Sequence, residues 1–116
     1  MAAPHHVELR SGTALVSNAR VAYGWFDRLR GLLGVRSLTH PDGLLITHCS
    51  SVHSFWMRMT IDVVYLDDDF EVKKVVSRLR PWRISFGGRR TSQTLELPAG
   101  TIESLGIAAG QSLERE

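Results

Sequence analysis

The sequence lacks the features that mark secreted and membrane-spanning proteins. Its 116 residues include one cysteine, Cys49, so no disulfide can form within the chain, and such a chain fits a reducing compartment. The longest apolar runs are only a few residues, far below the roughly 20 needed to cross a bilayer. The first ten residues do not have the pattern of a secretory signal. We therefore expect a cytoplasmic protein with no membrane span.

Lysine is scarce as well, because the basic residues are twelve arginines and only two lysines. The net charge of +2 is too small to indicate nucleic-acid binding by itself. Hydrophobic residues make up 43% of the chain and charged residues 22%, which is typical of a globular protein. A chain of this length forms one domain whose core needs neither a disulfide nor a structural metal. We expect a monomer with a single domain over residues 1–116, disordered at residues 1–6.

Alternation of apolar and polar residues predicts strands over most of the chain. Short strands are expected at residues 7–10, 13–21, 44–47 and 94–97, with a final strand or tail at 107–115. The alternation also runs from His53 to Leu66 and predicts a strand there, covered on both faces toward its end. A bend between Arg58 and Ile61 would exchange the two faces beyond it, Asp62 included. Three aspartates then form a turn, and residues 61–66 and 70–79 make the clearest hairpin.

One segment changes to the helical period. Trp25, Leu29 and Leu32 share one side, which predicts an amphipathic helix at about residues 24–33. A short second helix is expected at about residues 101–105, with Thr101 as its N-cap and Gly106 at its end. The fold class is therefore mainly β (α+β): a compact β-barrel or sandwich-like sheet with two helices.

Reactive side chains gather between residues 48 and 69, next to apolar ones. Alternation puts His53 and Met57 on a nearly pure apolar face, with Arg58 and Asp62 on the other. Asp62 lies between two apolar residues, and a buried carboxylate must be paired or hydrogen-bonded. Its expected partner is an arginine such as Arg58 or Arg83, or a set of backbone amides.

Two reactive arrangements are open in this stretch. Cys49 with His53 as base and Asp62 as orienting acid follows the logic of a thiol hydrolase, and His48, Cys49, His53 and Met57 are ligand types for copper(I) or zinc. Four residues along a strand span about 13 Å, which is too far for joint chemistry unless the chain bends near residue 50. The three-aspartate turn lacks the ligand spacing of a calcium loop.

Residues 78–90 are rich in arginine. The segment holds no acidic residue and contains Arg78, Arg80, Arg83, Arg89 and Arg90 together with Trp82 and Phe86. Such a mixture can hold phosphates and stack on bases, or it can contact an acidic protein. The plainer interpretation is a solvated loop.

Four motifs carry a family resemblance. GLLG at 31–34, VHSFWMRMTIDVVYLD at 52–67, RLRPWR at 78–83 and LELPAGT at 95–101, with glycines at 106 and 110, together resemble the bacterial and archaeal family called domain of unknown function 192. The match covers residues 13–113. Met59-Thr60 stands where the nearest branch often has Phe-Pro, and Phe70 stands where a turn glycine is common.

The resemblance implies a compact, mainly-β fold with the helix at 24–33 packed against it. It implies no reaction, because the family has no established activity. On the family's motif the candidate site residues are His53, Met57, Arg58 and Asp62, with Arg80 and Trp82 nearby.

We therefore expect a small bacterial binding or accessory module rather than an enzyme, with no catalytic residue, metal or cofactor. It would recognise a small anionic ligand or a protein partner through a pocket near His53, Arg58, Asp62 and Trp82. The alternative is a hydrolase or metal-binding protein that uses Cys49 and His53. Nucleic-acid binding through residues 78–90 is the second alternative, and we expect it less than the others.

Overall fold

The computed structural model describes residues 5–22 and 37–115 of the chain, so the helix predicted at 24–33 lies outside the described residues. These ranges contain the strands β1 (His6–Ser11), β2 (Ala14–Ala22), β3 (Asp42–Thr47), β4 (Ser51–His53), β5 (Ile61–Leu66), β6 (Val72–Leu79), β7 (Ile84–Phe86), β8 (Gln93–Pro98) and β9 (Glu114–Arg115), and the helix α2 (Thr101–Leu105). None of the helices in these ranges is long and apolar enough to cross a membrane.

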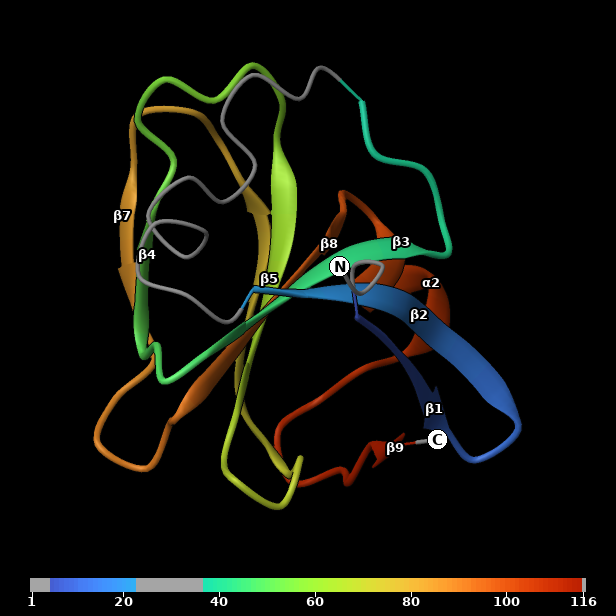
Figure 1. Ribbon diagram of the computed structural model, residues 1–116. Helices are drawn as coiled ribbons and strands as arrows, with labels where there is room; N and C mark the ends of the chain where they lie inside the picture. The colour runs from blue at the N-terminus through green and yellow to red at the C-terminus, as the bar shows by residue number, and fades with distance from the viewer. Residues whose placement is uncertain (1–4, 23–36, 116) are drawn as a thin grey trace.

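A curled sheet of seven strands forms the body of the protein (Figure 1). Its order is β6-β5-β8-β3-β2-β1-β9, while β4 and β7 pair separately as a two-stranded sheet. β2 and β3 run parallel, and the other neighbouring strands are antiparallel. The large sheet curls into a half-barrel with the small sheet beside it (Figure 1). The mainly-β prediction, the barrel-like sheet and the short helix at 101–105 are confirmed.

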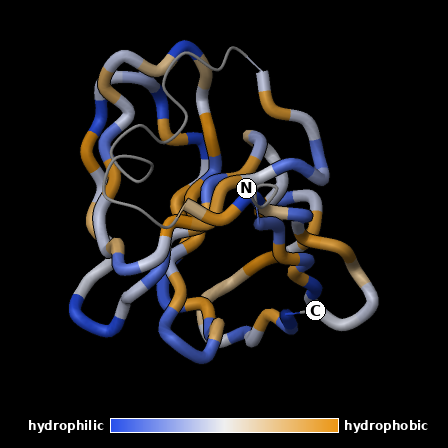
Figure 2. The backbone as a smooth tube through the Cα atoms, viewed as in Figure 1, coloured by the Kyte–Doolittle hydropathy of each residue, from blue (hydrophilic) through white to orange (hydrophobic). Residues whose placement is uncertain are grey.

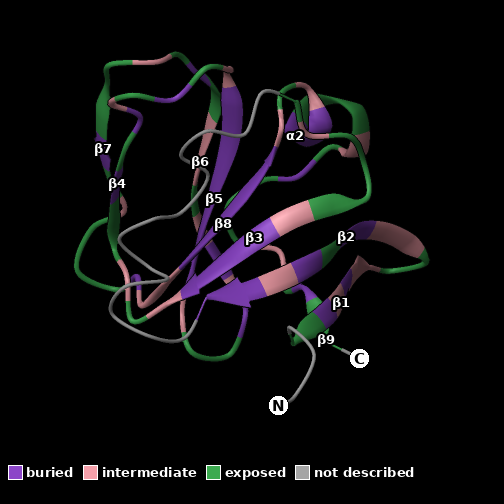
Figure 3. Cartoon of the chain, turned by 45° about the horizontal axis from the view of Figure 1, so that its top comes forward, coloured by how far each residue is buried: buried purple, intermediate pink, exposed green. Residues whose placement is uncertain are grey.

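Both faces of the large sheet are buried, because successive side chains on a strand point to opposite sides. One cluster includes Leu45, Val64 and Leu95 and is covered by Ile102 of α2. The other lies on the side of the small sheet, and its members include Leu44, Ile46, Val52, Met57, Ile61, Val63 and Tyr65. β5 is buried at all six positions (Figure 3), as its two apolar faces predicted. Figure 2 shows apolar residues along the central strands and again in the outlying pair of strands.

The strand predicted from His53 to Leu66 is interrupted, and the interruption is longer than the bend between Arg58 and Ile61 that the sequence left open. The chain leaves β4 after His53, makes a turn, and enters β5 only at Ile61. Trp56 has φ 70° in this turn, a left-handed conformation that lies outside the β region. At the N-terminus, His6 belongs to β1 and the backbone carbonyl of His5 accepts a hydrogen bond from the N–H of Val21. The disorder predicted for residues 1–6 therefore does not extend to these two histidines.

The carboxylate of Asp62 ties β5 to the start of α2. It is fully buried and accepts the backbone N–H groups of Arg78 at 2.9 Å, Gly100 at 3.1 Å and Ile102 at 2.9 Å. The partners of Asp62 are thus backbone amides, one of the two kinds expected. The N-cap prediction for Thr101 is wrong, because Gly100 occupies that position and the Thr101 hydroxyl donates to the carbonyl of Pro98 instead. Gly106 ends the helix with φ 66°, as predicted.

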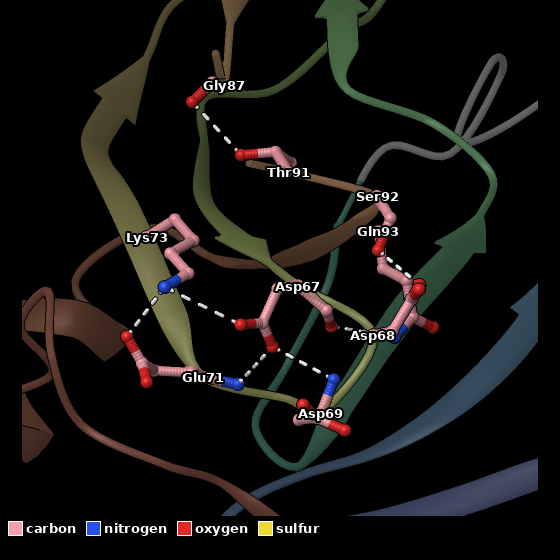
Figure 4. A network of polar contacts seen from close by, with 9 residues as sticks. All are labelled: Asp67, Asp68, Asp69, Glu71, Lys73, Gly87, Thr91, Ser92 and Gln93. Atoms are coloured by element: carbon pink, nitrogen blue, oxygen red, sulfur yellow. Dashed lines mark hydrogen bonds and ion pairs between the residues drawn. The ribbon is translucent and has the colours of Figure 1, made fainter. Parts of the chain in front are cut away.

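The three-aspartate turn is held together by its first residue (Figure 4). Oδ1 of Asp67 accepts the N–H of Asp69 at 2.9 Å and the N–H of Glu71 at 3.0 Å. These backbone hydrogen bonds, that of Glu71 first, lower the pKa of Asp67. Lys73 lies 3.5 Å from Oδ2 of Asp67, and the Gln93 amide donates to the carbonyl of Asp67. The carboxylate therefore holds the turn and contacts Lys73 of β6, while the backbone carbonyl of the same residue joins the turn to β8.

Candidate functional site

The strand β7 of the small sheet has its polar side chain inside and its two apolar side chains outside. Val52 of β4 pairs with Ser85 of β7, and both are buried. Ile84 and Phe86 flank Ser85 and are 56% and 65% exposed. Strands usually place apolar side chains inside and polar ones outside. In β7 this placement is reversed, because the hydroxyl of Tyr65 donates to Oγ of Ser85 at 2.9 Å inside the protein. As a result, β7 presents its apolar side chains to solvent.

Four rings continue this exposed surface. The rings of His53 and Phe55 have centroids 5.1 Å apart, Phe55 stacks on Trp82 at 5.7 Å, and Trp56 meets Trp82 edge-on at 4.7 Å. Trp56 is 70% exposed and Trp82 is 53% exposed. We call the surface made by His53, Phe55, Trp56, Trp82, Ile84 and Phe86 the aromatic face.

Both tryptophans of the aromatic face have left-handed backbones. Trp56 has φ 70° and Trp82 has φ 66°, a conformation that costs a residue with a side chain about 1–2 kcal/mol. Such a cost persists only where the surroundings fix the backbone, and it is often found at functional sites. An exposed side chain gains little burial to offset this cost. The conformation therefore points to a role outside the fold.

Ser54 fixes the turn that carries Trp82. Its side chain is fully buried, and its hydroxyl donates to the carbonyl of Arg80 and accepts the N–H of Arg83 at 2.9 Å. The backbone of Ser54 also accepts the N–H of Trp82 at 3.0 Å and donates to the carbonyl of Arg83 at 2.8 Å. Four hydrogen bonds thus hold residues 80–83 against the start of the 54–60 turn. This role was not predicted, since a single serine in an alternating stretch carries no such signal.

The surroundings of the aromatic face are positively charged. Arg58 is exposed two residues after Trp56, and Arg80 and Arg83 are exposed on either side of Trp82. The segments 50–61 and 77–92, which supply the face, contain no acidic residue. This part of the surface therefore suits a negatively charged ligand or partner.

A groove opens beside β7. It has a volume of about 330 Å³ and is lined by Val76, Arg78, Leu79, Arg80, Arg83 and Ile84. β6 is the end strand of the large sheet, so the groove lies between the two sheets. The side chain of Lys74 on β6 donates to the carbonyl of Phe86 on β7 at 2.8 Å. At this point a lysine side chain joins the two strands.

The structure brings together some of the residues singled out from the sequence and separates others. His53 and Trp82 are joined through Phe55, and Arg80 lies in the same turn as Trp82. Met57 is buried in the core under this surface. Asp62 is buried where β5 meets α2 and its carboxylate binds backbone amides, so it does not share a pocket with His53. Trp56 and Ile84 were missed, whereas Phe86 was noted only as a ring within the arginine-rich segment 78–90.

Cys49 and His53 do not form a nucleophile and its base. The thiol donates to the carbonyl of Ser51 at 2.9 Å and packs beside the core cluster on the side of the small sheet. The ring of His53 instead contacts Phe55 on the aromatic face. Over the ranges 5–22 and 37–115, no three His, Cys, Asp or Glu side chains come together in a way that could hold a metal ion. The arrangement gives no support to the hydrolase or to the metal site.

A buried carboxyl group lies in the middle of the large sheet. Glu96 of β8 pairs with Val63 and Leu44 on the neighbouring strands, and its Oε2 has no hydrogen-bond partner among the described residues. Burial raises the pKa of Glu96 to about 7. Burial also raises the pKa of Tyr65, on the same face of the sheet. The sequence placed Glu96 on the face opposite Leu95 and Leu97, but it did not show that this face is covered.

Comparisons with known proteins agree with the family resemblance. The family model DUF192, described as an uncharacterised family, matches residues 7–115. A UPF0127 protein from Thermococcus sibiricus is 28% identical over 109 residues, which make up 90% of this chain and 70% of that protein. A UPF0127 protein from Pyrococcus furiosus is 38% identical over 65 residues, 56% of this chain and 55% of its own length.

Two crystal structures share the fold. A protein of unknown function from Novosphingobium aromaticivorans superimposes with a TM-score of 0.84 at 17% identity, covering 97% of this chain and 93% of that one. A Sinorhizobium meliloti protein described as a "putative transcription regulator" gives 0.85 at 21% identity, covering 97% and 94%. At these identities the likeness shows the fold alone. With its family match over residues 7–115, the chain belongs to the DUF192 family, whose function is not established.

Proposed function

We propose that this protein is a small, non-catalytic binding module that recognises a protein partner through the aromatic face and the arginines around it. The observation that carries the proposal is the pair Trp56 and Trp82: both are largely exposed and both have left-handed backbones. Exposed apolar patches rimmed by polar residues mark interaction sites. Tryptophan and arginine are also the residues that most often dominate binding energy at protein interfaces.

The chemistry of the face suits a protein more than a small molecule. Small-molecule sites are concave and enclose most of their ligand, whereas Trp56, Trp82, Ile84 and Phe86 are exposed on a short strand and the turns beside it. Covering such side chains removes apolar area from water, which contributes about 25 cal/mol per Å². The surrounding arginines add charge selectivity, so the partner's contact surface is acidic at its rim.

Five of the residues expected from the sequence keep a place in this proposal. His53 and Trp82 belong to the aromatic face, while Arg58 and Arg80 supply positive charge next to it. Met57 supports the face from the core beneath. With its single cysteine, the module still fits a reducing compartment such as the cytoplasm.

Site-specific photo-crosslinking tests the proposal. The protein carries benzoylphenylalanine in place of Ile84, or in place of Ala108 as an exposed control in the segment that follows α2, and is irradiated in an extract of its source cells. We expect adducts with polypeptides from position 84 and not from position 108. The same adducts should be lost when Trp56→Asn and Trp82→Asn are added. Equal labelling at both positions, or adducts that survive the double substitution, would overturn the proposal.

Nucleic-acid binding is a second candidate. Residues 78–90 carry five arginines without an acid, and one solved structure with the same fold is described as a "putative transcription regulator". This candidate predicts that a single-stranded oligothymidine binds with a steep salt dependence, and that Arg89→Ala with Arg90→Ala reduces the salt slope. Binding that behaves in this way would replace the protein partner with a nucleic acid.

A further inference from the structure

We infer that the groove between β6 and β7 is the docking site for an extended, acidic segment of the partner protein, which adds a strand between the two sheets. This inference rests on the proposed function and gives the partner's chemistry and its mode of binding. It is carried by the backbone of β7, by the residues that line the groove, and by the distribution of charge around it.

The outer edge of β7 has backbone groups available for pairing. The N–H of Gly87 donates to the carbonyl of Ser50 and the N–H of Ser54 donates to the carbonyl of Arg83. In an antiparallel pair these bonds recur at every second residue, so the backbone groups of Ser85 point toward β4. Those of Ile84 and Phe86 therefore point away from β4, toward the groove. The Phe86 carbonyl already accepts the Lys74 side chain, which a partner strand would displace there. An edge with unpaired N–H and C=O groups is a template for another strand.

The other wall of the groove belongs to the end strand of the large sheet. β6 has β5 on one side and no strand on the other among the described residues. Val76 and Leu79 of β6 line the groove opposite Ile84, and the Lys74 side chain reaches across to the carbonyl of Phe86. The Lys74 contact places β6 and β7 within a side chain's length of each other, and a strand inserted in the groove would join the sheets.

The lining residues define which strand fits. Three are arginines (Arg78, Arg80 and Arg83) and three are apolar (Val76, Leu79 and Ile84). A strand presents alternate residues to opposite sides, so a segment with alternating acidic and apolar residues matches both kinds of lining. Arginine binds carboxylates with two parallel hydrogen bonds. These contacts fix the register of the segment as well as its charge.

A carboxylate of this same chain already reaches the rim of the groove. Nη2 of Arg78 lies 3.2 Å from Oε2 of Glu103 on α2, and both side chains are largely exposed. An exposed ion pair of this kind is weak, so a carboxylate of the partner can replace Glu103. A second copy of this chain fits poorly, because edge-to-edge pairing at β7 would bring Arg80 and Arg83 against the same arginines, and like charges repel.

A synthetic ten-residue peptide of alternating valine and glutamate is the probe, and its binding to the full-length protein is followed by isothermal titration calorimetry. One control peptide carries lysine in place of glutamate. A second keeps all side chains but has N-methyl groups on alternate residues, so that it cannot donate to a strand edge. We expect the glutamate peptide to bind and each control to bind at least tenfold more weakly.

Protein variants locate the peptide. Arg80→Ala and Arg83→Ala should each weaken binding at least fivefold, whereas Arg89→Ala, a matched exposed arginine in the turn after β7, should change it less than twofold. No binding, or equal binding of the N-methylated or lysine peptide, would overturn strand addition by an acidic segment. Binding that is lost in Trp56→Asn but unchanged in Arg80→Ala and Arg83→Ala would contradict this inference and would still agree with the proposed function. Failure of the crosslinking at position 84 would instead count against the proposed function itself.

Discussion

Replacing Glu96 with glutamine should make this protein more stable at alkaline pH relative to the wild type. The side chain is buried between β3 and β5, and burial raises the pKa of Glu96 from 4.5 to about 7. A group whose pKa is higher in the folded state favours folding most when it is protonated. The contribution of Glu96 to the free energy of unfolding is therefore greatest below pH 4.5. It falls as the pH rises from 4.5 and reaches its lower limit above pH 7.

The size of the effect follows from the two pKa values. One pKa unit corresponds to about 1.4 kcal/mol, so the interval from 4.5 to about 7 corresponds to about 3 kcal/mol of lost stability. Glutamine has a similar shape and does not titrate. The Glu96→Gln variant should therefore escape this loss, whatever constant difference the amide introduces at every pH.

Urea unfolding at pH 4.5, 6, 7 and 8.5 measures this difference. We expect the free energy of unfolding of Glu96→Gln, minus that of the wild type, to rise by about 3 kcal/mol across this range. Glu114→Gln, an exposed substitution on β9, is the control and should give a flat difference. Parallel curves for Glu96→Gln and the wild type would refute the reasoning, because they would mean that the folded protein accommodates the charged carboxylate.

Three further substitutions test the supports of the fold and of the aromatic face by denaturant unfolding. Gly87→Ala should cost about 1–3 kcal/mol, because a Cβ at this position overlaps the ring of Tyr65; an unchanged stability would mean that the ring can move aside. Asp62→Asn should cost about 1–3 kcal/mol, since an amide cannot accept all three backbone N–H groups; a neutral result would contradict its role at the start of α2. Ser54→Ala should also cost about 1–3 kcal/mol, because the buried N–H of Arg83 loses its hydroxyl partner, and no loss would show that the turn does not need it.

The parts of the fold that follow from local pattern were predictable. The hairpin of β5 and β6 was marked by two β-prone runs around an aspartate turn, and β8 by Leu95 and Leu97 on one face. The burial of β5 on both sides followed from its apolar residues at consecutive positions. In these segments local propensity and the final packing favour the same structure, so the sequence alone is sufficient.

The candidate site depends on contacts that no local pattern encodes. β4 pairs with β7, so Val52 meets Ser85 across a long sequence separation, and the inward hydrogen bond from Tyr65 reverses the usual placement of the apolar residues around Ser85. The left-handed turn at Trp56 ends the alternation on which the single long strand was predicted. The hydrogen-bond partner of a buried carboxylate cannot be predicted from sequence either. Asp62 accepts hydrogen bonds from backbone amides and not from an arginine side chain.

The most direct test of the central claim is the free energy of unfolding of the double variant Trp56→Asn, Trp82→Asn. Asparagine tolerates the left-handed backbone of both positions, and both side chains are largely exposed. If the aromatic face exists for binding, we expect a change of less than about 1 kcal/mol, since relief of backbone strain offsets the lost ring contacts. A loss of about 3–5 kcal/mol or more in the double variant, as for an aromatic residue removed from a core, would contradict the account and assign these rings to the fold.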